Sequence, residues 1–314
     1  MPTEKIQLVV PAEHSGRRLD QVLALLCPEH SRSRLQAWIR DGFVTVDNEK
    51  LRQRDTVIEG QMININAEIT AVKEFEREDI PLDIVFEDEA LLLINKPANL
   101  VVHPGAGNPR HTLLNALVHY LPELENLPRA GIVQRLDKDT TGVMVIAKTL
   151  PAHTYLVEKL QLRQVSRYYQ AIVHGVLTAG GTVDAAISRH TRQRKRMAVN
   201  DSGKQAVTHY RILQKFSNHT HVRLQLESGR THQIRVHMAH IKHPVVGDPV
   251  YGGRPKLPRA ASAELLEVLG RFRRQALHAY ELGLVHPTTG KEMNFVAELP
   301  SDMLELLEVL KNES

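Results

Sequence analysis

The stretch that organises this sequence is Gly131–Gly142, which reads GIVQRLDKDTTG. Within it, Asp137 and Asp139 alternate with an arginine and a lysine, and two threonines follow. Charges at this density do not suit a hydrophobic core, yet the letters IV precede them and VMVI follow them. A polar loop held between two β-like runs is where catalytic groups are commonly presented. The pattern therefore predicts a strand-like frame with a chemically active loop.

The composition is that of an ordinary globular protein. The chain has 314 residues, of which 42% are hydrophobic and 24% charged, and this length favours two domains. No apolar run approaches the roughly 18 to 20 residues that span a bilayer. The start, MPTEKIQLVV, is too polar for a secretory signal. The single cysteine, Cys27, cannot form an internal disulfide, so we expect a buried thiol and a cytoplasmic protein.

The net charge of +4 is unevenly distributed. Residues 73–89 hold eight acidic and two basic side chains, so the rest of the chain carries +10. Two runs are strongly basic, RHTRQRKR at 189–196 and RFRR at 271–274. Such clusters indicate a polyanion partner, although a charged run can also be solvated surface. The candidate contacts in the first run are Arg192, Arg194, Lys195 and Arg196.

Residues 1–67 are predicted to form a small domain. RRLDQVLALLC has apolar residues at helical spacing, and SRSRLQAWIRDG repeats that pattern until a glycine ends it. Two strands, FVTVD and QMININ, follow. This helix-helix-strand order, with cations around the second helix, resembles the S4 RNA-binding domain. The resemblance makes Arg32, Arg34 and Arg40 candidate RNA contacts.

The rest of the chain divides into a linker and a larger unit. Residues 68–80, EITAVKEFEREDI, lack periodic apolar positions and suit a solvated linker. From 81 to 314, strand-like segments outnumber helical ones and often form hairpins, as in LDIVF-EDEA-LLLINK. Helices are expected over 112–121, 152–163 and 231–241. We therefore expect an α+β fold with a mixed, mostly antiparallel sheet in the larger unit.

Three chemistries compete for the RLDKDTTG loop. Asp137, Asp139 and Thr141 match the D-x-D-x-T pattern of aspartyl-phosphate phosphatases. That chemistry needs Mg²⁺ and further carboxylates, and downstream only an isolated Asp248 is found. A zinc site is suggested by 17 histidines and by the H-x-x-H-x-x-H spacing at 237–243. On a helix, that spacing spreads the rings too widely for one tetrahedral centre.

The third interpretation rests on the cations of the loop. Asp137 lies close to Arg135 and Lys138, and neighbouring opposite charges favour the ionised form of a carboxylate. An ionised carboxylate serves as a nucleophile or a base rather than as an acid. Together with the basic clusters and the S4-like domain, this favours carboxylate chemistry on a nucleotide within RNA.

Four separated segments carry a family resemblance: INKPANLVVHPGAGN, GIVQRLDKDTTG, RYYQAIVHG and ESGRTHQIRVHMA. They resemble the RluA-type pseudouridine synthases, and with the S4-like segment the likeness covers nearly the whole chain. The resemblance implies a catalytic domain over 81–314 that isomerises a uridine in large-subunit ribosomal RNA, either naked or in a pre-ribosomal particle. The N-glycosidic bond is broken and the turned uracil is rejoined through carbon. No cofactor and no metal are implied, in keeping with the lack of a G-x-G-x-x-G fingerprint or a P-loop.

The same resemblance implies roles for individual residues. Asp137 matches the family's catalytic aspartate, Tyr169 the tyrosine that stacks on the uracil, and Arg235 the arginine that pairs with the aspartate. Arg135 matches the residue that fills the gap left by the flipped base, since a stacked base cannot be reached. Arg230 is a rival for the arginine role. Whether the aspartate attacks the nucleotide or removes a sugar proton stays open.

Other points also stay open at the level of sequence. Gln134 stands where the family usually has histidine, which bears on base flipping or target choice. The loop that contains Asn95, Lys96, Pro97 and His103 could support the structure or contact RNA. A non-catalytic RNA-binding factor of ribosome assembly is the alternative function. No feature demands more than a monomer.

Overall fold

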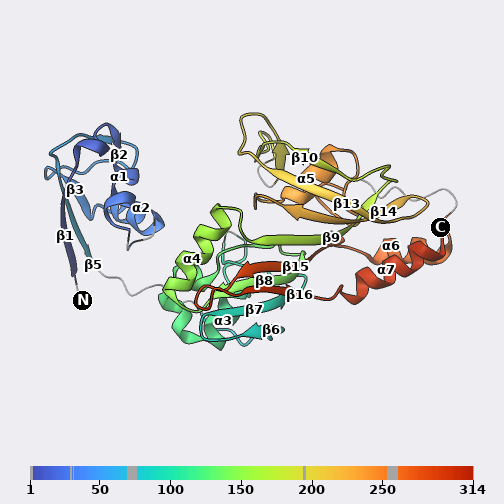
Figure 1. The fold of residues 1–314 in the computed structure, drawn as a ribbon. Coiled ribbons are helices and arrows are strands. Elements are labelled where there is room, and N and C mark those ends of the chain that lie inside the picture. Colours follow the sequence, from blue (N-terminus) through green and yellow to red (C-terminus); the bar gives the residue numbers. More distant parts are fainter. Residues whose placement is uncertain are drawn as a thin grey trace. The chain divides into compact units, whose positions relative to one another are not determined.

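The computed structural model describes residues 3–28, 30, 32–68, 76–105, 107–193, 196–252 and 261–313. The chain divides into two compact units, Met1–Glu74 and Phe75–Ser314, which are described separately (Figure 1). The predicted RNA contacts Arg194 and Lys195 lie outside the described residues, as do residues 69–75 of the predicted linker and the side chain of Arg32. No helix within the described ranges is long and apolar enough to cross a membrane.

Unit 1 combines two α-helices with a three-stranded antiparallel sheet of order β1-β5-β3. Its elements are β1 (Thr3–Val9), η1 (Ala12–His14), β2 (Arg17–Arg18), α1 (Leu19–Leu26), α2 (Arg32–Arg40), β3 (Val44–Val46), β4 (Thr56–Val57) and β5 (Met62–Glu68). Both predicted helices and both predicted strands are present. Strand β1 was not predicted from the sequence, where its alternating charged and polar residues hide the apolar Ile6 and Leu8 that pack against the core.

The helices of unit 1 form because their apolar residues recur every three to four positions. In α2 these are Leu35, Trp38 and Ile39, all buried, and they meet the buried face of α1 and the inward side chains of β3 and β5. Cys27 is buried in the same core, as expected. This core shares no residue with the cores of unit 2.

Unit 2 is built around a nine-stranded sheet of order β10-β13-β14-β9-β15-β8-β7-β6, with β16 also paired to β15. Its strands are β6 (Ile84–Glu87), β7 (Leu91–Lys96), β8 (Thr141–Ala147), β9 (Ser166–His174), β10 (Gly181–Asp184), β13 (Val207–Lys215), β14 (His219–Leu226), β15 (Leu277–Val285) and β16 (Glu292–Val296). Of the strand pairs in the described residues, only β8–β15 is parallel. The prediction of an α+β fold with a mixed, mostly antiparallel sheet is confirmed.

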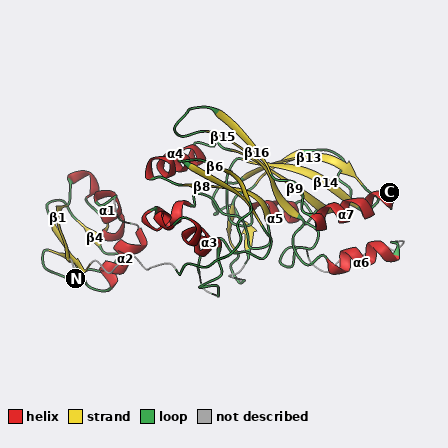
Figure 2. Ribbon diagram, turned by 90° about the horizontal axis from the view of Figure 1, so that it is seen from below, coloured by secondary structure: helices red, strands yellow, loops and turns green. Residues whose placement is uncertain are grey.

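The helices of unit 2 lie on this sheet or at its ends (Figures 1 and 2). They are α3 (Leu113–Tyr120), η2 (Pro122–Asn126), η3 (Pro128–Gly131), α4 (Leu150–Gln161), α5 (Gln233–His240), α6 (Ala263–Arg271) and α7 (Ser301–Asn312). A separate hairpin of β11 (Ile187–Arg189) and β12 (Met197–Val199) carries the basic run 189–196. Helices α3, α4 and α5 match the predicted ranges within a few residues, whereas α6 and the hairpin were not predicted.

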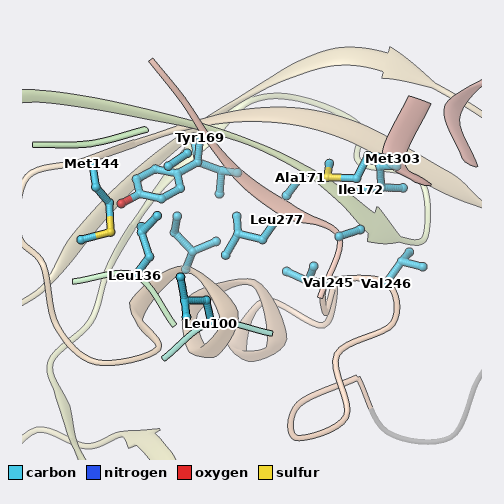
Figure 3. Packing of buried hydrophobic residues seen from close by; sticks show 14 of the residues in the cluster. Leu100, Leu136, Met144, Tyr169, Ala171, Ile172, Val245, Val246, Leu277 and Met303 are labelled. Carbon is cyan, nitrogen blue, oxygen red and sulfur yellow. The ribbon is translucent and has the colours of Figure 1, made fainter. Parts of the chain in front are cut away.

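Both faces of the central strands are buried, which explains their continuous apolar sequence. Along β8, Met144 and Ile146 belong to the large core, while Val143 and Val145 belong to the core on the opposite side, with α4. Strand β7 alternates in the same way. Figure 3 shows part of the large core, in which the ring of Tyr169 lies beside Met144 and other apolar side chains.

The predicted linker boundaries differ from the structure at both ends. Glu68 is the last residue of β5. Residues 76–80 are bonded to unit 2: Arg77 pairs with Glu125 at 2.9 Å, and the amide of Asn115 donates to the carbonyl of Glu76 at 2.7 Å. Residues 76–80 are therefore attached to unit 2 by polar contacts. Ion pairs and hydrogen bonds do not require apolar residues at regular spacing, so the sequence pattern could not reveal this attachment.

The separation of the cores predicts that unit 2 folds alone. Removing residues 1–74 takes away a complete core without opening another, so the remaining chain should unfold cooperatively at a melting temperature close to that of unit 2 in the full chain. Calorimetry of both proteins measures this. A broad, non-cooperative transition in the shortened chain would show that the boundary at residue 74 is misplaced.

Candidate active site

Unit 2 contains a cavity of about 890 Å³ at one edge of the large core. Its walls come from the loop before β8, from β9, from the end of α4 and from the loop between β14 and α5. The structure brings together here all five residues that the sequence assigned to the catalytic unit's centre: Asp137, Tyr169, Arg235, Arg135 and Arg230.

An arginine bound to two carboxylates lies at the centre of the site. Arg235 Nη1 donates to Asp137 Oδ2 at 2.9 Å. The same guanidinium donates from Nε and Nη2 to the two oxygens of Asp248, at 2.6 and 2.9 Å. The side chain of Asp248 is fully buried, whereas that of Asp137 keeps 16% exposure toward the cavity. Asp137 is thus the carboxylate that a substrate can reach.

Asp248, an isolated acid in the sequence, shares Arg235 with Asp137 in space. It also accepts backbone N–H groups of Val250 and Tyr251, at 2.8 and 3.0 Å. Burial raises the pKa of its carboxyl, but Arg235 and these N–H groups outweigh burial and hold the pKa below the usual range. Burial likewise lowers the pKa of Arg235, and the two aspartates outweigh it and raise the value. The signal for Asp248 is spatial, so no pattern of neighbouring acids could reveal it.

The two candidate arginines have different surroundings. Arg235 contacts Asp137, whereas Arg230 is exposed and donates from Nε to the carbonyl of Gln205 at 3.2 Å. The geometry therefore favours Arg235 as the partner of the aspartate. Arg135 is exposed at the cavity wall two residues before Asp137, with Gln134 beside it.

His232 approaches the other oxygen of Asp137, with Nε2 3.8 Å from Oδ1. Its Nδ1 lies 2.8 Å from the hydroxyl of Tyr251, which accepts the backbone N–H of Met197 at 2.8 Å. Burial lowers the pKa of His232, against the opposing charge of Asp137. Helix α5 begins at Gln233, directly after this histidine. The φ of 57° at His232 is not helical, so the helix does not extend further toward the N-terminus.

Tyr169 belongs to both the core and the cavity. It is 8% exposed, lies in the large apolar core and lines the cavity (Figure 3). Burial raises the pKa of its hydroxyl. Only a small part of the side chain is therefore available to a ligand, and apolar neighbours pack around the ring.

Lys96 supports the loop that contains Asp137. Its side chain is fully buried, and Nζ donates to three carbonyl oxygens, those of Pro97, Leu100 and Lys138, at 2.6, 3.0 and 3.0 Å. The last of these follows Asp137 directly in sequence. Of the two roles left open for this segment, Lys96 fulfils structural support. His103, from the same segment, lines the cavity.

The two threonines of the loop are hydrogen-bonded to side chains in β15 and in the segment just before it. Thr140 Oγ1 accepts from Gln275 at 3.0 Å, and Thr141 Oγ1 lies 2.8 Å from His278 Nδ1. Gly142 has a φ of +116°, and a Cβ there would lie 2.2 Å from the carbonyl oxygen of Ala279. Only glycine permits this approach of β8 to β15.

Two of the three arginines in the second basic run, RFRR, are paired with acids of the fold. Arg274 is buried and binds both carboxylate oxygens of Asp302 in α7 at 2.7 Å, and its Nη1 reaches the carbonyl of Asp139 at 3.4 Å. Arg271 pairs with Glu305. These cations are neutralised by α7, so they hold the fold together.

The first basic run is more accessible. Arg192 is exposed on the β11–β12 hairpin, and Arg196 lies over the ring of Tyr251 at 5.2 Å. In unit 1, Arg34 lies over the ring of Trp38 at 5.5 Å, and Arg40 is exposed beside Asp41, with its Nε 3.2 Å from Oδ1.

Two histidines of the H-x-x-H-x-x-H run, His237 and His243, have separate partners. His237 lies 2.9 Å from both Thr208 Oγ1 and the carbonyl of Ala185, and His243 lies 2.8 Å from the carbonyl of His174. Among the described residues, no group of three or more potential ligands could hold a metal ion.

Comparison with known proteins agrees with the motifs. The family model for RNA pseudouridylate synthase matches residues 90–240, and the S4 domain model matches residues 17–63. Ribosomal large subunit pseudouridine synthase D of Pseudomonas aeruginosa is 59% identical over 304 residues, 97% of this chain and 95% of that protein. The protein of the same name from Escherichia coli K12 is 56% identical over 311 residues, 98% of this chain and 95% of its own length.

A solved structure shows the same fold for most of the chain. Human RNA pseudouridylate synthase domain containing 4 is 30% identical, with a TM-score of 0.57 over 73% of this chain and 93% of the human chain. The predicted resemblance thus holds over the motifs, the fold and nearly the full length. The chain therefore belongs to the RNA pseudouridylate synthases: it is a pseudouridine synthase, an isomerase, with an N-terminal S4 domain.

Proposed function

We propose that this enzyme isomerises specific uridines of large-subunit ribosomal RNA to pseudouridine, and that Asp137 carries the reaction on a flipped-out nucleotide. The observation that carries the proposal is the Asp137–Arg235 ion pair, which lies at a cavity whose charged lining residues are mostly arginines. The relatives named above are large-subunit ribosomal enzymes, which supports the same class of substrate for this chain.

The two carboxylate oxygens of Asp137 have different surroundings. Oδ2 accepts a hydrogen bond from Arg235 at 2.9 Å, which fixes the orientation of the carboxyl group. Oδ1 lies 3.8 Å from His232 Nε2, too far for a hydrogen bond, and no other donor among the described residues is found for it. A free carboxylate oxygen serves either attack on the nucleotide or removal of a sugar proton.

The reaction exchanges one bond of uracil for another. The N1–C1′ bond breaks, the uracil turns, and a C5–C1′ bond forms. C5 loses a proton and N1 gains one, so no external oxidant, reductant or group donor is needed. Besides the carboxylate of Asp137, the protein has to bind, orient and shield the nucleotide. Tyr169, packed in the cavity wall, is the residue to which we assign stacking on the uracil.

Access to the uridine requires that it leave the base stack. Arg135 is exposed beside the cavity and is long enough to occupy the space that the base vacates. The charge of the surrounding wall attracts RNA, because Arg129 and Arg230 also line it. Binding away from the cavity is assigned to the hairpin 189–196, including Arg192 and Arg196, and to unit 1 through Arg34 and Arg40.

The catalytic assignment predicts the behaviour of Asp137→Asn, which keeps the shape of the side chain and removes its charge. Turnover should fall by at least about 10⁴-fold, an increase of roughly 5 kcal/mol in the barrier. RNA binding should persist, because a negative charge facing the phosphates is lost. The measurement is tritium release from RNA that carries 5-tritiated uridine, at saturating enzyme.

Asp139→Asn is the matched control, because no side-chain bond to Asp139 is found among the described residues and its carbonyl is unaffected. It should keep most of the turnover. If Asp137→Asn retained more than a few per cent of turnover, the carboxylate would be only an anchor of the loop. Such an anchor would show instead as a lower melting temperature.

The hairpin assignment predicts the salt dependence of RNA binding. Arg189→Gln with Arg192→Gln removes two exposed cations. The slope of log affinity against log salt should decrease in magnitude by roughly 0.7 to 0.9 for each lost phosphate contact. Arg271→Gln is the control, since its cation already pairs with Glu305. Equal slopes in all three proteins would identify the hairpin as solvated surface.

The support of the loop by Lys96 predicts a loss of both stability and turnover in Lys96→Met. Three buried carbonyls lose their donor, and an unsatisfied buried group costs about 1–3 kcal/mol. Lys138→Ala is the control, because Lys96 binds the backbone carbonyl of Lys138 and not its exposed side chain. Chemical denaturation and tritium release measure the two effects.

The stabilities of the wild type and of Lys96→Met should also depend differently on pH. Burial lowers the pKa of Lys96 to about 7, against the opposing charges of Asp139 and Asp137. An unfolded lysine has a value of about 10.4. Between these two values the unfolded state binds more protons, so the free energy of unfolding rises with pH. The stability difference between wild type and Lys96→Met should therefore grow from about pH 7 to about pH 10, whereas a constant difference would contradict the titration.

A further inference from the structure

Arg167 is a buried cation in the wall of the active-site cavity, and the reaction proposed above does not use it. It lies on β9, two residues before Tyr169, and side chains two apart on a strand point to the same face. It is 8% exposed and lines the same cavity as Asp137 and Tyr169.

No acceptor within the described part of the chain binds this guanidinium. Its Nε is buried and has no hydrogen-bond partner there, and no carboxylate forms an ion pair with it. Its neighbours differ: Arg163 pairs with Glu227 at 2.5 Å, and Arg235 binds two aspartates. Arg167 is therefore the cation on this wall that is both deeply buried and uncompensated.

Such an arrangement is costly for the free protein. A buried charge is normally paired, because removal from water is unfavourable without a partner. Burial accordingly lowers the pKa of Arg167, although a guanidinium stays protonated. The loop opposite leaves room for the group, since a Cβ at Gly229 would lie 2.9 Å from Arg167 Nη1. The free enzyme thus holds a cation ready for an anion that arrives with the substrate.

We propose that Arg167 binds a phosphodiester oxygen of the RNA beside the flipped uridine. The assignment rests on the proposed function, which places a nucleotide next to Asp137 and Tyr169. A phosphodiester is the group of an RNA nucleotide with a full negative charge, whereas the uracil carbonyls carry only partial charges. Arginine binds phosphate through charge-assisted hydrogen bonds, often two at once. Arg167 thereby positions the backbone of the nucleotide while the base turns.

The test compares stability with RNA binding in Arg167→Met. Loss of an uncompensated buried cation should leave the melting temperature of the free protein unchanged or higher. Affinity for a large-subunit ribosomal RNA transcript should fall roughly 10- to 100-fold at low salt. The slope of log affinity against log salt should decrease by roughly 0.7 to 0.9. Arg167→Lys, which keeps the charge, should retain the slope.

Arg223→Met is the matched control, because Arg223 is a half-buried arginine of β14 outside the cavity lining that pairs with Glu281 at 2.8 Å. It should lower the melting temperature and leave the slope unchanged. The same behaviour in Arg167→Met would make Arg167 structural, and an unchanged slope with lower turnover would make it a uracil contact. Either result overturns the proposal. Binding is measured without turnover, so a failure of the proposed reaction, seen as absent tritium release by wild type, is a separate outcome.

Discussion

The active site depends on one guanidinium that neutralises two carboxylates. Arg235 has a side chain 5% exposed, and it holds Asp137 on one side and Asp248 on the other. Breaking a buried ion pair typically costs about 3–5 kcal/mol, because the remaining charge is buried without a partner and is not hydrated by water. Here two carboxylates would lose their partner together. The bridge also joins the loop before β8 to helix α5 and the turn that follows this helix, which lie about a hundred residues further along the chain.

A polar loop at the edge of a core must find donors for its carbonyls. The loop 137–142 obtains them from the scaffold: Lys96 binds the carbonyl of Lys138, and Arg274 reaches that of Asp139. Arg274 is itself fixed by Asp302 of the last helix. The position of Asp137 is therefore set by strands and helices from both ends of unit 2.

This dependence on distant residues explains what the sequence could and could not reveal. Helical spacing identified α1 and α2, and alternating or continuous apolar runs identified β7 and its hairpin with β6, because these signals are local. The motifs placed Asp137, Tyr169 and Arg235, and the structure brings them to one cavity. Asp248 and the acids that pair with the RFRR run were missed. Their partners are adjacent only after folding, and a count of charges cannot show which cations are already neutralised.

Whether an arginine is paired with an acid indicates its availability to RNA better than the net charge of the chain does. Arginines that face acids, such as Arg163 and Arg274, contribute to the fold and have little left for a ligand. Arg135 and Arg167 have no carboxylate partner among the described residues, one at the mouth of the cavity and one buried in its wall. An anion of the RNA lowers the free energy most where a cation is both uncompensated and shielded from water. Arg167 is such a site, on the wall of the cavity that also contains Asp137, the carboxylate to which we assign the reaction.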